Sequence, residues 1–433
     1  MAVEKKVSVV TLGCPKNVVD TEVLLAQLRS NNIRLVNENA GADTVLINTC
    51  GFIQDAKRES LEAIFHAVEK KKRGEVRNIV VFGCLSERFR NELSAELPEV
   101  DRFIGTNRLR EVLESIGADY RKELLGERLL TTPSHIAYLK ISEGCDHPCS
   151  FCAIPLMRGP HRSVPLEHLL AEAGNLAAKG VRELIVIGQD TTFYGADLYG
   201  QQRLAPLLSE LAAIEGIEWI RLMYAYPAHF PLDVIDVFRT NPKLCRYIDM
   251  PVQHVSDAVL KSMRRGITER ATRELIGRLR TDLPDLALRT TLIVGYPNET
   301  EDDFRRLCEF VEETQFHRLG VFPYSREEGT AAYDLGDPVP HEVKMERQSI
   351  ILDIQKEISD RYNASLVGNV VRILVDSSGS GKAVGRTQWD APEIDQDVVV
   401  HAERPPAAGT FLRVTIDSAE EYTLQASAGI TTG

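Results

Sequence analysis

The chain has 433 residues, of which 43% are hydrophobic and 26% are charged, and its formal net charge is −12. This length exceeds that of one ordinary domain, so about two to four domains are expected, and the composition is typical of a soluble globular protein. The acidic excess disfavours a general nucleic-acid binder, because non-specific affinity for phosphate comes mainly from Lys and Arg.

The start of the chain, MAVEKKVSVV, does not resemble a signal peptide, and no apolar run reaches the length of a membrane span. We therefore expect a cytoplasmic protein with no membrane partner. Thiols stay reduced in the cytoplasm, so the eight cysteines are expected to be ligands, catalytic groups or buried thiols rather than disulfides.

Three short apolar runs in the first third of the chain each end in a cysteine. They are VVTLGC (9–14), VLINTC (45–50) and IVVFGC (79–84). Apolar residues at helical spacing in 18–28 and 56–70 separate them, a pattern typical of buried parallel strands in an α/β domain. Ligands bind at the carboxyl edge of such sheets. We expect that edge to bring together Cys14, Cys50 and Cys84.

Six further apolar runs alternate with helical patterns in the central region. The expected strands cover residues 136–142, 182–188, 218–224, 246–251, 286–295 and 317–325. Such alternation predicts a parallel β/α barrel, incomplete because it has six units rather than eight. A long charged helix follows, and short alternating runs after it predict a small antiparallel β-barrel.

The fold class expected is therefore α/β multidomain. Its parts are a small parallel α/β domain (1–125), an incomplete (β/α)6 barrel (131–340), a linker helix (341–366) and an antiparallel β-barrel (367–433).

The stretch CDHPCSFC follows the first expected barrel strand and has the spacing C-x3-C-x2-C, with Cys145, Cys149 and Cys152. Active sites lie at this end of β/α barrels, which favours chemistry over a structural role. A four-iron cluster usually takes four cysteine thiolates and a structural zinc ion takes four protein ligands, so either group would lack one ligand. A zinc knuckle completed by His147 or His161 is the alternative that the residues leave open.

The remaining chemistry-bearing residues divide into core and site candidates. Cys308 lies among apolar residues at helical spacing, and Cys245 has no cysteine neighbour, so both are expected in the core. The segment MRGPHRS (157–163) directly follows the three-cysteine motif and is expected to line the substrate entrance.

The three-cysteine motif at the mouth of a β/α barrel resembles that of the radical S-adenosylmethionine superfamily. In that superfamily three thiolates bind three irons of a [4Fe-4S] cluster, and S-adenosylmethionine chelates the fourth. The resemblance implies that Cys145, Cys149 and Cys152 are catalytic in this sense. Candidate S-adenosylmethionine contacts at later strand ends are Gly188, Gln189, Gln253, His254 and Gly295.

The whole chain resembles the methylthiotransferases, with a TRAM-like last barrel. Within that family, the motifs LGCPKN (12–17), NTCGFI (48–53), GQDTTFYG (188–195), DMPVQH (249–254) and DAPEID (390–395) are similar to the branch that modifies the β-carbon of an aspartate in a small-subunit ribosomal protein. The resemblance implies two [4Fe-4S] clusters, the first of them on Cys14, Cys50 and Cys84 and carrying the sulfur. It also implies S-adenosylmethionine as radical source and methyl donor, and a reducing electron donor of the flavodoxin or ferredoxin type.

The charge of the tail offers a test between substrate classes. From residue 366 onward there are five basic and nine acidic residues, a net of 5 − 9 = −4. A MiaB-like branch modifies an adenosine in transfer RNA, and a barrel that holds RNA would be basic. An acidic barrel suits a basic ribosomal protein, so we expect the acids of DAPEIDQD (390–397) to face that protein. Nucleic acid is therefore not the expected substrate.

A second alternative is an electron carrier with two clusters and no chemistry of its own. Carriers normally saturate their irons with four cysteines, which this chain does nowhere, so the enzyme reading is favoured.

Overall fold

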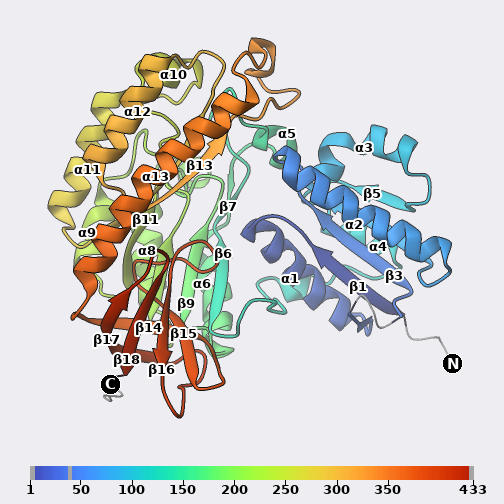
Figure 1. The fold of residues 1–433 in the computed structure, drawn as a ribbon. Helices are drawn as coiled ribbons and strands as arrows, with labels where there is room; N and C mark the ends of the chain where they lie inside the picture. Colours follow the sequence, from blue (N-terminus) through green and yellow to red (C-terminus); the bar gives the residue numbers. More distant parts are fainter. Residues whose placement is uncertain (1–4, 38–40, 429–433) are drawn as a thin grey trace.

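The computed structural model describes residues 5–37 and 41–428 and contains three main sheets (Figure 1). A five-stranded sheet comes first in the chain, a six-stranded sheet follows, and a closed five-stranded barrel comes last. Among the described residues, no helix combines the length and the apolar character needed to cross a membrane.

The first sheet is parallel throughout and has helices on both faces, as predicted. Its strands are β1 (Lys6–Thr11), β2 (Arg34–Leu35), β3 (Thr44–Thr49), β4 (Asn78–Gly83) and β5 (Arg102–Ile104), in the order β2-β1-β3-β4-β5. The helices are α1 (Pro15–Ser30), α2 (Gln54–Lys72), α3 (Cys84–Glu96), α4 (Leu109–Ser115) and the short η1 (Lys122–Leu124). Successive side chains of a strand point to opposite faces. Val45 and Ile47 therefore pack with α2 and α3, whereas Leu46 packs with α1 and α4.

The second sheet is an open, incomplete barrel of six parallel strands, as predicted, with β6 and β13 at its edges. The strands are β6 (Ile136–Lys140), β9 (Glu183–Ile187), β10 (Trp219–Leu222), β11 (Leu244–Asp249), β12 (Ala287–Val294) and β13 (Arg318–Pro323). The longer helices along this part are α6 (Leu166–Ala178), α8 (Leu204–Ala212), α9 (Asp233–Thr240), α11 (Glu269–Asp282) and α12 (Glu301–Thr314). The shorter elements are β7 (Ser142–Glu143), α5 (Ile154–Arg158), β8 (Arg162–Ser163), α7 (Ala196–Tyr199), α10 (Asp257–Ser262) and η2 (Tyr333–Leu335).

The predicted helix over 341–366 is present as α13 (His341–Leu366). It lies along α12 and β13, and its Ile351 and Ile358 belong to the outer core of the barrel (Figure 1). The helix therefore covers the open barrel as well as linking it to the tail. Cys245 lies in the inner core and Cys308 packs against the outer core, which confirms both as core positions.

The tail forms a closed barrel of β14 (Val370–Gly379), β15 (Lys382–Thr387), β16 (Asp397–His401), β17 (Phe411–Ala419) and β18 (Thr423–Ala428), in the order β14-β15-β16-β18-β17. Four of its five pairings are antiparallel, as predicted, but β16 and β18 run parallel. The exception arises because β17 pairs with β14, so that β18, returning from β17 in a hairpin, closes the barrel beside β16.

The terminal barrel packs against the amino ends of the central strands through buried polar contacts. Glu183, the first residue of β9, accepts a 2.8 Å hydrogen bond from Arg386, and Arg318, the first of β13, donates one of 2.5 Å to Asp390. Asp395 accepts a 2.8 Å bond from the Tyr247 hydroxyl.

This packing corrects the prediction that the acids of DAPEIDQD face a substrate. Asp390 has no exposed surface and the side chain of Asp395 is only 2% exposed, because both serve the contact with the central barrel. Only Glu393 and Asp397 of these acids are exposed.

Candidate active site

The three cysteines of the first domain lie where α1, α2 and α3 begin, at the carboxyl edge of the sheet. Cys14 immediately precedes α1, Cys50 follows β3, and Cys84 is the first residue of α3. A Cβ added to Gly13 would lie 2.6 Å from Cβ of Cys50, so this turn, at φ +89°, admits only glycine. A Cβ on Gly51 would similarly meet the backbone of Leu85 at 2.8 Å. The three turns are thus packed together, as the sequence predicted.

Hydrogen bonds hold these turns in place. The Asn17 side chain donates to the carbonyl of Leu12 at 2.7 Å and to that of Thr49 at 3.2 Å, which ties the first turn to the second. The hydroxyl of Ser60, on α2, accepts from the amide of Cys50 and donates to its carbonyl. These hydrogen bonds therefore fix the backbone turns that carry Cys14 and Cys50.

The second set of cysteines lies in the loop after β6, at the carboxyl end of the central sheet. The amide of Cys145 donates to the carbonyl of Gly159 at 3.1 Å, and that of Cys152 donates to the carbonyl of Cys149. Sγ of Cys149 lies 3.5 Å from Nη1 of Arg265 and 3.7 Å from the Tyr226 hydroxyl, which itself donates to the carbonyl of Arg265 at 2.7 Å.

The two histidines of the zinc alternative have other partners. Nε2 of His147 lies 2.6 Å from Asp190, and its ring stacks on Tyr226 with centroids 3.7 Å apart. Nε2 of His161 lies 3.1 Å from the hydroxyl of Ser163. Within residues 5–37 and 41–428, no three His, Cys, Asp or Glu side chains are grouped to hold a single metal ion.

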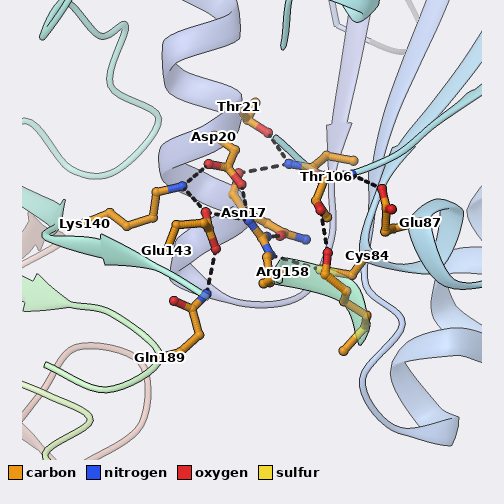
Figure 2. A network of polar contacts seen from close by, with 12 residues as sticks. Asn17, Asp20, Thr21, Cys84, Glu87, Thr106, Lys140, Glu143, Arg158 and Gln189 are labelled. Atoms are coloured by element: carbon orange, nitrogen blue, oxygen red, sulfur yellow. Dashed lines mark hydrogen bonds and ion pairs between the residues drawn. The ribbon is translucent and has the colours of Figure 1, made fainter. Parts of the chain in front are cut away.

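A network of charged side chains links Cys84 of the first set to the segment just before the second set (Figure 2). Arg158, in the predicted entrance segment, donates from Nε to Sγ of Cys84 at 3.2 Å and from Nη1 to Asp20 at 2.7 Å and Glu143 at 3.1 Å. Lys140 also bonds Asp20 and Glu143. Asp20 belongs to α1 and Glu143 to β7, so the network fixes the first domain against the loop that carries the second set.

The network perturbs the acid–base properties of its members. Although burial raises it, the pKa of Asp20 is lowered to about 2 by Lys140 and Arg158. Burial raises the pKa of Cys84 to about 12, with Arg158 acting in the opposite direction, and raises that of Cys152 to about 12. Metal binding replaces the protons of thiol ligands, so a cluster bound here would hold these sulfurs as thiolates.

The five predicted S-adenosylmethionine contacts occupy different environments. Gln189 donates to Glu143 at 2.8 Å, and its amide oxygen, like that of Gln253, is buried without a hydrogen-bond partner in the described structure. His254 is fully buried, and its Nδ1 accepts from the amide of Ser256.

The two glycines of that prediction have packing roles. A Cβ on Gly188 would lie 2.7 Å from the Ser142 hydroxyl, and one on Gly295, at φ +70°, would lie 2.3 Å from Cγ of Lys344 on α13. In the described structure, the buried polar side-chain atoms of the set that lack a hydrogen-bond partner are the two glutamine oxygens and Nε2 of His254.

Comparison with known proteins agrees with this arrangement. The description "Uncharacterized protein family UPF0004" matches residues 6–105, the Radical SAM superfamily matches 139–311, and the TRAM domain matches 367–428. The fold resembles the radical S-adenosylmethionine methyltransferase TsrM from Kitasatospora setae (TM-score 0.56, 13% identity, 73% of each chain). It also resembles the cobalamin-dependent radical enzyme OxsB (TM-score 0.52, 14% identity, 81% of this chain and 56% of that one).

The open six-stranded barrel and its three-cysteine loop thus define a radical S-adenosylmethionine enzyme with a TRAM domain. The proteins named "Ribosomal protein uS12 methylthiotransferase RimO" from Flavobacterium johnsoniae and Christiangramia forsetii are 51% and 50% identical to it, each over 97% of this chain and over 97% and 94% of their own. The chain belongs to the RimO family of methylthiotransferases.

Proposed function

We propose that the chain transfers a methylthio group to the β-carbon of an aspartate in ribosomal protein uS12, using two [4Fe-4S] clusters and S-adenosylmethionine. The observation that carries the proposal is that Arg158 contacts Cys84 of the first set and also Glu143, two residues before Cys145 of the second set. The names of the relatives supply the substrate. The transfer RNA alternative finds no support among these relatives.

Each cysteine set would hold one cluster and leave one iron without a protein ligand. Cys14, Cys50 and Cys84 form the first set, and Cys145, Cys149 and Cys152 form the second. The second cluster with S-adenosylmethionine supplies the hydrogen abstraction from carbon that acid–base side chains cannot perform.

The chain's own residues position these groups and adjust their charge. Arg265 donates toward Sγ of Cys149, and Arg158 donates toward Sγ of Cys84, so each set has a cation beside one cysteine sulfur. Gln189 and Gln253 offer buried amide oxygens at the strand ends, where the amino or hydroxyl groups of S-adenosylmethionine would find acceptors.

Two further parts of the proposal concern the surroundings of the enzyme. A reduced flavodoxin or ferredoxin supplies the electron that reaches the second cluster. A ribosomal-protein substrate sets the reaction in the cytoplasm, where ribosomes are assembled.

The test is a product assay with anaerobically reconstituted enzyme, S-adenosylmethionine and a reductant. Mass spectrometry should detect a methylthio group on one aspartate of uS12 and none on transfer RNA. Modified transfer RNA would favour the MiaB-like function, and a protein that holds clusters but never cleaves S-adenosylmethionine would be an electron carrier.

A further inference from the structure

Lys16 is a buried cation in the interface between the first domain and the central barrel. It is the second residue of α1, two positions after Cys14, and only 8% of its surface is exposed. Its Nζ lies 3.2 Å from the ring centroid of Tyr224. Tyr224 lies two residues after Leu222, the last residue of β10. The ammonium group therefore lies at the carboxyl end of the barrel strands, on the side where both cysteine sets are found.

No described residue supplies Lys16 with an acidic partner. The Lys16 side chain forms no ion pair or hydrogen bond in the part of the chain that the structure describes, although the charges of Cys14, Asp249 and Glu143 attract it from beyond contact distance. Its ammonium group lies against the Tyr224 ring. A buried charge without a partner is costly. A cation in the first turn of a helix also opposes the helix dipole. The fold itself gains little from a lysine at this position.

The cations around Lys16 are accounted for by their own partners. Arg158 and Lys140 bond Asp20 and Glu143, as described above. Arg289 lies 3.0 Å from Asp249, whose other oxygen accepts from the amide of Tyr224. The carboxylate of Asp249 is therefore already engaged by direct partners, and it attracts Lys16 without forming an ion pair with it.

Arg265 is a second interface cation without a carboxylate, but its guanidinium has different partners. It donates to Sγ of Cys149 and to the carbonyl of Pro251. Among these interface cations, Lys16 alone has neither a carboxylate nor a hydrogen-bond acceptor in the described structure.

We propose that Lys16 binds the side-chain carboxylate of the target aspartate. The inference rests on the proposed function, in which the reacting β-carbon of the aspartate is bonded directly to that carboxylate. Holding the carboxylate at Lys16 fixes the β-carbon at the interface between the two cysteine sets. The Tyr224 ring fixes the ammonium group without neutralising it, which leaves its charge for the substrate. Lys16 is then a residue that determines specificity for aspartate over its neutral analogues.

The experiment measures the dissociation constants of uS12 and of uS12 in which the target aspartate is replaced by asparagine. The wild-type holoenzyme should bind the aspartate form roughly ten- to a hundredfold more tightly, because the bond lost is a charge-assisted one. Lys16→Met should bring this ratio close to one, whereas Lys16→Arg should retain most of it. Arg29→Met, which removes an exposed cation from the same helix, should leave the ratio unchanged.

Several outcomes would overturn the inference. They are equal binding of both uS12 forms by the wild type, an undiminished ratio in Lys16→Met, or an equal loss of affinity for both forms. Iron content and circular dichroism verify that each variant is folded. Should Lys16→Met fail to fold, the ratios of dissociation constants measured for the wild type and for Lys16→Arg still test the inference. A wild type that methylthiolates uS12 while Lys16→Met still discriminates refutes only the role of Lys16, whereas a wild type that never modifies uS12 refutes the proposed function.

Discussion

Replacing Asp390 with asparagine separates two roles for the acids of the terminal barrel. If these acids attract a basic substrate, neutralising any one of them should weaken substrate binding. In the structure, however, Asp390 is fully buried and accepts from Nε of Arg318 at 3.0 Å, from Nη2 at 2.5 Å and from the hydroxyl of Thr387. Asp390→Asn should therefore destabilise the contact between the two barrels.

The size of the effect follows from the burial of the pair. The side chain of Arg318 is 9% exposed and that of Asp390 is 0% exposed. Removing one partner of a buried ion pair leaves an uncompensated charge and costs about 3–5 kcal/mol. At about 2–4 °C per kcal/mol for a domain of 150–250 residues, the unfolding temperature should fall by roughly 6–20 °C, with the lower part of this range expected for a larger cooperative unit.

The assay is thermal unfolding followed by circular dichroism, with Glu393→Gln as the matched control. Glu393 lies in the same loop, is exposed and forms no ion pair in the described part of the chain. Its neutralisation removes the same charge and should change stability by about 0.5 kcal/mol or less. Equal and small effects of the two variants on stability, with equal losses of uS12 binding, would refute the structural reasoning.

Three further predictions concern the site. Replacing Cys145, Cys149 and Cys152 together with alanine should leave about four irons per chain and abolish cleavage of S-adenosylmethionine; loss of all iron, measured by colorimetric assay, would contradict two independent clusters. Cys14→Ala should still cleave S-adenosylmethionine but yield no methylthiolated uS12, and normal product by mass spectrometry would rule out the first set as the sulfur carrier. Asp20 has a pKa depressed from 3.8 to about 2, so its stabilisation is complete above about pH 4 and is lost as the pH falls through 2. In urea unfolding of the cluster-free protein, the difference between wild type and Asp20→Asn should accordingly shrink below pH 4, and a difference that is constant down to pH 2 would contradict the role of the ion pairs.

The sequence predicts the parts of this fold that depend on local pattern. Runs such as VLINTC alternate with amphipathic segments, and β-branched residues bounded by turns form strands whether or not their neighbours are known. The cysteines directly after these runs then share one sheet edge, because parallel strands all end on the same side. The bounds differ, as for β1, which ends at Thr11 rather than at Cys14, and the pattern does not predict the short edge strands β2 and β5.

The sequence does not predict which charges meet in space. Arg158 reaches Asp20 and Cys84 across 138 and 74 positions of the chain, and no spacing rule connects residues so far apart. A count of charges in the tail likewise does not distinguish Asp390 from Glu393, although Asp390 is buried and Glu393 is exposed. The segment MRGPHRS, directly after the cysteine motif, was the one signal that pointed toward Arg158.

Buried charge pairs at both ends of the central barrel fix the positions of its neighbours. At the amino end, Arg386 bonds both Glu183 and Asp376. At the carboxyl end, the side chain of Glu327, 4% exposed, bonds Lys57 at 2.6 Å and Arg88 at 2.7 Å from the first domain.

Separating any of these pairs would leave a desolvated charge, so sliding of the domains past one another is energetically opposed. The proposed transfer of a methylthio group to a carbon held between the two cysteine sets would require such a fixed geometry, since misplacement by about 1 Å can cost about a hundredfold in rate. Against this background of matched charges, Lys16 is the interface cation that the protein leaves for an anion from outside, and the anionic side chain of the target aspartate meets that requirement.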